Sequence, residues 1–276
     1  VSRPVQTLAM EHLMDRAAAE LGLDPVDVRL TNLVREYPHT SPTGLVLDPS
    51  SHVESLERAR ELVDLPGFRE RQAEARTQGR YLGIGFSCFA ERTGYGTPAF
   101  AARSMGITPG YEQVRLTVDP SGNVVLRIGA SPHGQGLRTT LAQVVSDELG
   151  LTPDRIRVVH SDTDDTPYGW GSFGSRAMVI AGGATVTASR QMRDRLAVIA
   201  ADVLECAPED IELADGRASV RGTDVSTSVA DIARLAHHSS HKLPEGQEPG
   251  LEETAVYNPG GTFSNAVHVV EAEVDA

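Results

Sequence analysis

The sequence predicts an α+β fold in which small modules of helices on mixed sheets follow a helical N-terminal segment. Apolar residues recur at helical spacing through residues 1–80, and from residue 81 they alternate as in strands. At 148–158 and again at 204–213 a helix is expected to end, proline to turn the chain and a strand to begin. This suggests a repeated module, and convergence on the same turn chemistry would give the same pattern. We therefore expect a helical segment at 1–80, packed on the rest of the chain or on a partner, and an α+β region at 81–276.

The composition is that of a water-soluble globular protein. The formal net charge of −13 argues against a nucleic-acid partner, since phosphate binding needs a clustered excess of Lys and Arg. No apolar run is long enough to span a membrane, and no secretory leader is evident. Cys88 and Cys206 lack the spacing of a metal site or a disulfide framework. We expect them to be small buried apolar groups in a cytoplasmic protein.

Start and stop signals divide the helical segment. The Asp24-Pro25 dipeptide supplies an N-cap followed by proline at the first helical position. The sequence Ser-His-Val-Glu at 51–54 is a capping-box pattern. The Pro-Gly pair at 66–67 is expected to break that helix before a charged helix at 68–78. The stretch 38–50, rich in Pro, Ser and Gly, is expected to be a loop.

Strand periodicity begins with an apolar, glycine-spaced stretch typical of a buried strand, and the stretch 93–110 that follows is expected to be a loop. A turn at 119–123 joins two alternating stretches into a β-hairpin. Together the expected strands are 81–89, 114–118, 124–128, 156–159, 211–213, 218–220 and 266–274.

Three further helices are expected at 137–149, 175–205 and 229–236. In the longest one, Gly182 and Gly183 would allow another backbone to approach closely. Its apolar residues expected to face the core are Val179, Ile180, Val186, Met192, Leu196, Ile199 and Val203.

Two glycine-rich loops, at 129–136 and 162–176, each precede a helix. Glycine permits backbone conformations that other residues avoid, and helix N-termini attract anions. The loops therefore favour an anionic or strongly hydrogen-bonding ligand. We expect them to converge on one cleft.

Two other interpretations of this region fail on their context. Residues 169–174 match the dinucleotide-binding pattern GxGxxG, with Asp194 at a suitable distance, but the polar run 161–168 separates them from the preceding strand. The sequence Asp-Thr-Asp at 162–164 resembles the first motif of haloacid-dehalogenase phosphatases. That chemistry also needs a downstream lysine and a late acidic pair. Lys242 is the only lysine and no such pair follows it, so these aspartates are better explained as solvated or helix-capping groups.

Taken together, the two loops resemble those of the large, molybdenum-binding subunit of the xanthine dehydrogenase and aerobic carbon monoxide dehydrogenase family, the molybdenum hydroxylases. The resemblance extends over essentially the whole chain, because its segments occur in the family's order. These segments are 11–33, the Gly-Ile-Gly strand at 83–85, 134–159, Asp-Thr-Asp at 162–164, Gly-Ser-Arg at 174–176 and the closing stretch 268–275.

The resemblance implies a fold of the molybdenum cofactor-binding domain type and a molybdopterin cofactor in its cytosine dinucleotide form. No protein side chain is expected to ligate the metal. Thr139 and Thr140 either favour phosphate or simply cap a helix, and Arg176 either faces the cofactor or pairs with Asp162 or Asp164. The residues that the resemblance places at the cofactor are Gly134, Gln135, Gly136, Thr139, Thr140, Ser172, Phe173, Gly174, Ser175 and Arg176.

The resemblance further implies that the chain is part of an enzyme that oxidises an aldehyde or an N-heterocycle with oxygen derived from water. Carbon monoxide is a less suitable substrate, because Leu137 and Arg138 stand where carbon monoxide dehydrogenases tend to have His-Glu. The family's general-base glutamate is expected outside this chain, so the chain alone should be inactive. Partner subunits carrying FAD and [2Fe–2S] clusters are implied, and a homodimer of the complex is possible in this family.

Several features allow a different interpretation. A non-catalytic scaffold domain derived from this fold would have its glycine loops far apart and filled by their own side chains. His237, His238 and His241 either bind a metal or lie in a solvated loop. Trp170 either shapes a substrate funnel or is a core aromatic residue.

Overall fold

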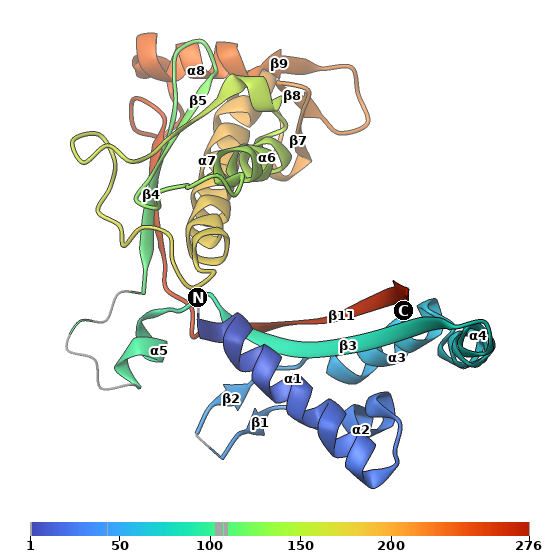
Figure 1. Ribbon diagram of the computed structural model, residues 1–276. Coiled ribbons are helices and arrows are strands. Elements are labelled where there is room, and N and C mark those ends of the chain that lie inside the picture. The colour runs from blue at the N-terminus through green and yellow to red at the C-terminus, as the bar shows by residue number, and fades with distance from the viewer. Residues whose placement is uncertain (1, 43, 103–106, 108–109, 276) are drawn as a thin grey trace. The chain divides into compact units, whose positions relative to one another are not determined.

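The computed structural model describes residues 2–42, 44–102, 107 and 110–275, and divides into two compact units. Unit 1 comprises residues 1–92 and 262–276, and unit 2 comprises residues 93–261. Unit 1 contains β3 (Arg80–Thr93, up to residue 92) and its partner β11 (Thr262–Asp275) as well as the N-terminal helices (Figure 1). The change of periodicity at residue 80 thus marks the start of a strand, and the chain passes into the second unit only after that strand.

The helices of unit 1 surround a small core. Its buried members are Val26, Leu56, Leu65 and Phe86. A short antiparallel pair of strands lies in the stretch expected to be a loop. The elements are α1 (Ser2–Leu21), α2 (Pro25–Asn32), β1 (His39–Thr40), β2 (Val46–Leu47), α3 (His52–Leu62) and α4 (Leu65–Thr77).

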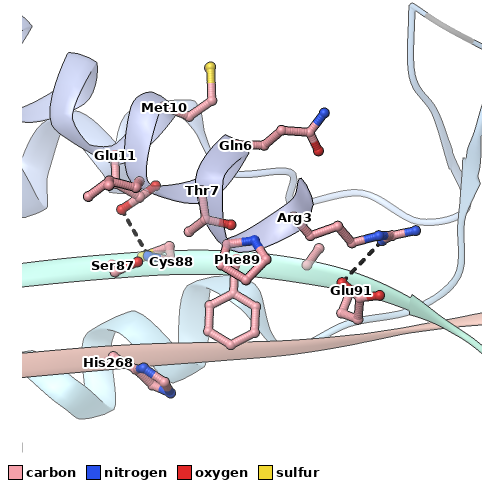
Figure 2. A pocket seen from close by; sticks show the side chains of 13 residues that line it. Arg3, Gln6, Thr7, Met10, Glu11, Ser87, Cys88, Phe89, Glu91 and His268 are labelled. Carbon is pink, nitrogen blue, oxygen red and sulfur yellow. Dashed lines mark hydrogen bonds and ion pairs between the residues drawn. The ribbon is translucent and has the colours of Figure 1, made fainter. Parts of the chain in front are cut away.

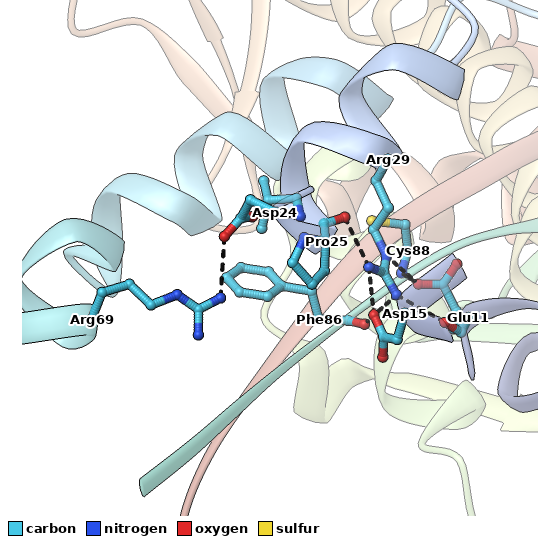
Figure 3. Close-up of polar contacts among 9 residues, drawn as sticks. Glu11, Asp15, Asp24, Pro25, Arg29, Arg69, Phe86 and Cys88 are labelled. Carbon is cyan, nitrogen blue, oxygen red and sulfur yellow. Dashed lines mark hydrogen bonds and ion pairs between the residues drawn. The ribbon is translucent and has the colours of Figure 1, made fainter. Parts of the chain in front are cut away.

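Arg29 of α2 connects that helix to α1 and to β3 (Figure 3). Its side chain is 2% exposed, and its guanidinium lies 2.8 Å from Glu11 Oε2 and 2.8 Å from Asp15 Oδ1, both on α1. It also donates to the Phe86 carbonyl of β3 at 3.1 Å. Glu11 Oε2 accepts the Cys88 N–H at 2.9 Å as well. One buried arginine of α2 therefore fixes α1 against β3.

The helix starts follow the expected signals only in part. Asp24 caps α2 by accepting the Val26 N–H at 2.8 Å, as expected. The predicted capping box is wrong, because the Ser51 side chain makes no capping hydrogen bond and instead contacts Ser55 Oγ at 3.2 Å. The Pro-Gly pair lies within the first turn of α4 rather than before it. Proline is tolerated there because its missing N–H has no helical partner.

Unit 2 is built on a four-stranded sheet in the order β10-β4-β5-β6, covered by helices α6 and α7 (Figure 1). The predicted hairpin of β4 and β5 is confirmed, and β5 pairs with β6 in parallel through α6. Parallel neighbours end at the same edge of a sheet, so the segments that follow β5 and β6 leave side by side. The elements are β4 (Glu112–Val118), β5 (Val124–Ile128), α6 (Leu137–Leu149), β6 (Ile156–Val159), α7 (Gly182–Leu204) and β10 (Glu252–Tyr257).

The long helix begins with a π-helical turn, Ala177–Ala181, before α7. Met192, Leu196 and Ile199 are buried as expected, whereas Val203 is 43% exposed and does not face the core. The close approach of another backbone expected at its glycines is not found: a Cβ on Gly183 would collide with the ring of Tyr257 on β10, and one on Gly182 would stand against the Met178 side chain.

The helix–turn–strand succession expected at two places is found at both, with β6 in the four-stranded sheet and β7 in a three-stranded one. α6 ends at Gly150 (φ 63°), a turn at Pro153 follows, and β6 begins. α7 ends at Glu205 (φ 54°), a turn at Pro208 follows, and β7 begins. The remaining elements are α5 (Thr97–Ala101), β7 (Ile211–Ala214), β8 (Arg217–Val220), β9 (Ser226–Ser228) and α8 (Val229–His238). α5 lies in the stretch 93–110, of which 103–106 and 108–109 are outside the described residues.

Candidate functional site

The first glycine loop follows β5 and opens α6. Gly134 and Gly136 have φ angles of 108° and 80°, and no atom lies within 4 Å of where a Cβ would stand at either. The backbone conformation, rather than crowding, therefore requires glycine here. Gln135 is exposed, and its Oε1 accepts the His133 N–H at 2.7 Å within the same loop.

The start of α6 has no side-chain cap among the described residues. Thr140 Oγ1 donates to the Leu137 carbonyl at 3.1 Å, and Thr139 is exposed. Thr140 therefore bonds within its own helix and does not cap it. An uncapped helix N-terminus carries partial positive charge on its free amides, which favours an anion.

A hollow of about 650 Å³ lies at this helix start. Arg138, beside the helix start, adds a positive charge to it and Asp154 a negative one, and apolar side chains of β6 supply part of its wall. Its lining includes Gly134, Gly136, Arg138, Thr139, Val158 and His160. Free amides, a cation and an apolar wall together suit a ligand that carries both phosphate and a flat ring system.

The second loop is organised around Arg176, whose side chain is fully buried with that of Glu112. Arg176 Nη1 pairs with Glu112 Oε1 and donates to the Gly171 carbonyl at 2.7 Å, and Nη2 donates to the Tyr111 carbonyl at 3.0 Å. The expected alternative of a pair with Asp162 or Asp164 is wrong. The reason is local: the Asp162 carboxylate accepts the N–H of Asp164 at 2.9 Å within its own turn.

Burial raises the pKa of the Glu112 carboxyl, and Arg176 and the Trp170 N–H, 3.1 Å from Oε1, oppose that rise. The Phe173 ring lies 5.2 Å from the Arg176 guanidinium carbon and is itself 42% exposed. Arg176 thus holds the loop from inside, and Phe173 is the member of the pair that reaches the surface.

The two loops meet backbone to backbone. A Cβ on Gly129 would stand 2.6 Å from Gly169 Cα, so both positions require glycine for lack of space. A second hollow, of about 590 Å³, is lined by residues of both loops, including Gly129, Ser131, Asp162, Gly169 and Gly171. The loops are therefore adjacent, unlike those of the scaffold interpretation. Residues 172–176 line neither hollow.

Of the remaining residues of the second loop, Gly174 and Ser175 are exposed and Trp170 is half-buried. Ser175 has a φ of 54°, and its carbonyl accepts the Gly94 N–H at 3.4 Å. Gly174 lies against the Tyr95 ring. Trp170 is half-buried beside Tyr168, with ring centroids 5.7 Å apart. Three buried polar atoms of this loop, Trp170 Nε1, Ser172 Oγ and Arg176 Nε, lack a hydrogen-bond partner within the described residues.

Neither the histidines near the end of α8 nor the two cysteines form a reactive site. A ring nitrogen of His237 contacts the Val118 carbonyl at 2.9 Å, which ties α8 to β4. Within the described ranges no group of three His, Cys, Asp or Glu residues is arranged to hold a metal ion. Cys88 and Cys206 are both free and half-buried, so the expectation that they are buried is met only in part.

A third hollow, of about 630 Å³, lies in unit 1 between α1 and β3 (Figure 2). Its charged side chains are engaged: Arg3 pairs with Glu91 at 3.1 Å, and Glu11 with Arg29. Burial raises the pKa of the Cys88 thiol to about 11. The hollow thus offers a mostly apolar groove without an activated nucleophile.

Comparison with known proteins identifies the family. Residues 58–276 match the molybdopterin cofactor-binding domain. The chain is 41% identical to the nicotine 6-hydroxylase large subunit of Paenarthrobacter nicotinovorans, over 98% of this chain and 33% of that protein. It is 32% identical to the carbon monoxide dehydrogenase large chain of Hydrogenophaga pseudoflava, over 96% and 33%. The crystal structure of quinoline 2-oxidoreductase from Pseudomonas putida 86 superimposes with a TM-score of 0.86, at 34% identity, over 98% of this chain and 35% of that chain.

The chain belongs to the molybdenum hydroxylase family, in whose large subunits it corresponds to a molybdopterin cofactor-binding portion. The resemblance stated from the sequence and the expected α+β fold are thereby confirmed. The chain spans about a third of the length of the curated relatives it matches, which are named as the large subunit or large chain of multi-subunit enzymes. Over the residues that the structure describes, none of the helices combines the length and the apolar character that crossing a membrane requires.

Proposed function

We propose that this chain holds the phosphate-bearing part of a molybdopterin cofactor at the start of α6, within the large subunit of a molybdenum hydroxylase. The uncapped helix start beside the 650 Å³ hollow is the observation that carries this proposal. Gly134 and Gly136 let the backbone present its amides, and Arg138 and Thr139 face the same space. When bound, the cofactor supplies a redox-active metal centre that takes up two electrons from the substrate.

The second loop has a supporting role in this proposal. The exposed side of Phe173 offers an apolar surface, whereas the unpartnered donors Trp170 Nε1, Ser172 Oγ and Arg176 Nε are buried behind it. Of the remaining residues expected at the cofactor, Gln135 and Thr140 contribute through the shape of the first loop and helix start, and Gly174, Ser175 and Arg176 through the shape of the second loop. The cytosine dinucleotide form fits a site that binds phosphates at one end and a ring at the other.

For the whole enzyme, we infer oxidation of an N-heterocycle, with an aldehyde as the second candidate. Two of the relatives are named for N-heterocycles, nicotine and quinoline. Leu137 and Arg138 in place of His-Glu disfavour carbon monoxide. Partner subunits with FAD and [2Fe–2S] clusters would accept the electrons, in a cytoplasmic complex. The general-base glutamate would come from another part of the large subunit.

The proposal is tested on the intact enzyme that contains this chain. Arg138→Glu places a negative charge at the helix start and should lower both the molybdenum and the acid-released CMP per large subunit by at least tenfold. Arg157→Glu is the matched control, because Arg157 is exposed on β6 but does not line the hollow. Metal analysis and nucleotide chromatography measure the outcome. A wild-type enzyme without molybdenum and CMP would refute the proposed function, and equal loss in both variants would refute the proposed site.

A further inference from the structure

Glu112, which no sequence motif singles out, lies at the point where the two glycine loops meet. It is the first residue of β4, two residues before Val114, which pairs with Ile128 of β5. Glu112 is therefore level with the start of the first loop, which follows Ile128. Its side chain has no exposed surface.

The two carboxylate oxygens of Glu112 face different partners. Oε1 binds Arg176 and accepts the Trp170 N–H at 3.1 Å, and both of those residues belong to the second loop. Oε2 lies where the loops cross, because a Cβ on Gly129 or Gly169 would stand 2.9 Å or 2.5 Å from it. Any side chain at either glycine would displace the carboxylate. One side chain thus spans the junction between the loops.

Burying the Glu112 carboxylate costs free energy, and that cost requires a reason. A carboxylate removed from water loses more solvation than a single ion pair returns, unless its remaining lone pairs are also satisfied. Glu112 Oε2 has no hydrogen-bond partner within the described part of the chain. A well-packed apolar side chain would fill the same space without that penalty. What an apolar side chain could not do is hold Arg176 and the Trp170 amide in one fixed geometry.

We propose that Glu112 is a positioning residue which, through Arg176, sets the spacing of the two glycine loops and thereby shapes the cofactor site. The expected effect on cofactor binding rests on the proposed function, whereas the expected effect on the two loops rests only on the contacts of Glu112. Removing the carboxylate leaves the buried guanidinium of Arg176 without its counter-charge, held only by the carbonyls of Gly171 and Tyr111, so the second loop is fixed less firmly. The first loop loses the part of its packing surface that the carboxylate provides at Gly129. Both loops should become more mobile, and the site should bind its cofactor less tightly.

The test uses Glu112→Ala and the isosteric Glu112→Gln, which keeps an acceptor for the Trp170 N–H. Hydrogen exchange of residues 129–136 and 169–176 is measured in this chain, and molybdenum with acid-released CMP is measured in the intact enzyme. In Glu112→Ala, exchange in both loops should accelerate at least tenfold and cofactor content should fall at least tenfold. Glu112→Gln should show the same changes at roughly threefold. If the alanine variant does not fold, the loop exchange and cofactor content of Glu112→Gln test the inference.

The matched control is Glu253→Gln, which breaks the partly buried pair of Arg195 and Glu253 between α7 and β10. It should lower the melting temperature without changing exchange in either loop, which separates positioning from general destabilisation. Unchanged exchange of 129–136 in both Glu112 variants would overturn the inference. If instead the wild-type enzyme lacks the cofactor while the loops still loosen, the proposed function fails and the positioning role stands.

Discussion

Among the residues that the structure describes, the side chains of Arg29 and Arg176 are almost fully buried, and each fixes the backbone around it. Arg29 donates to the carbonyls of Pro25 and Phe86, and Arg176 to those of Gly171 and Tyr111. A guanidinium suits this role because it presents five donors in one rigid plane. At the scale of single residues, a buried charge in this protein therefore organises chain segments that are distant in sequence.

The Cys88 thiol provides a prediction at this scale. Its pKa is raised to about 11, chiefly by burial and secondarily by Glu11, from an ordinary value of 9.0. At pH 8 the folded chain should therefore react with iodoacetamide about 100-fold more slowly at Cys88 than the unfolded chain does, since two pKa units reduce the thiolate a hundredfold. Because the fold favours the neutral thiol, its contribution to stability should be present below pH 9 and decline as the pH rises towards 11.

Peptide-level mass spectrometry measures the alkylation rate against pH, and the chain unfolded in urea supplies the reference. If the alkylation rate of the folded chain rises with a midpoint near pH 9, the predicted increase in the Cys88 pKa is wrong. Slow alkylation would then come from steric shielding, which lowers the rate without moving the midpoint.

At the scale of elements, the repeated helix–turn–strand module accounts for much of unit 2. The two copies use the same turn chemistry, yet their helices end differently. Gly150 closes α6 and Glu205 closes α7, both in the left-handed region. Glycine adopts that region without strain, whereas a residue with a Cβ loses roughly 1–2 kcal/mol there. The backbone is thus strained at Glu205, after α7, but not at the equivalent Gly150, after α6.

Glu205→Gly should therefore stabilise the chain, by about 1 kcal/mol after allowing for the greater freedom of glycine in the unfolded state. Equilibrium urea unfolding measures the change. Glu205→Ala serves as the control, since alanine retains the Cβ and should bring no comparable gain. A Glu205→Gly variant no more stable than Glu205→Ala would show that the left-handed cap carries no strain in this helix.

At the scale of the whole molecule, the chain leaves unit 1 through β3, forms unit 2, and returns through β11. All buried members of the large core cluster lie between Val114 and Ala255, within unit 2. A unit that contains its complete core has the contacts needed to fold independently.

Residues 93–261 expressed alone should therefore unfold in one cooperative transition and retain the far-ultraviolet circular dichroism expected for α6, α7 and the four-stranded sheet. Residues 137–261, which lack β4 and β5, should not fold, because half of that sheet is missing. Thermal melts followed by circular dichroism distinguish the two. A non-cooperative melt for 93–261 would show that unit 2 depends on unit 1.

The α+β class, the β4–β5 hairpin, the two helix–turn–strand successions and the resemblance to the molybdenum hydroxylases could all be predicted from the sequence. These features depend on local periodicity, on turn residues and on the order of motifs, all of which are written along the chain. The folded structure was needed to show that Arg176 pairs with Glu112, that Gly129 lies against Gly169, and that β3 joins β11 rather than the second unit. Those contacts join residues between 40 and nearly 200 positions apart, and no local pattern can encode which distant partner a buried charge or a glycine will meet.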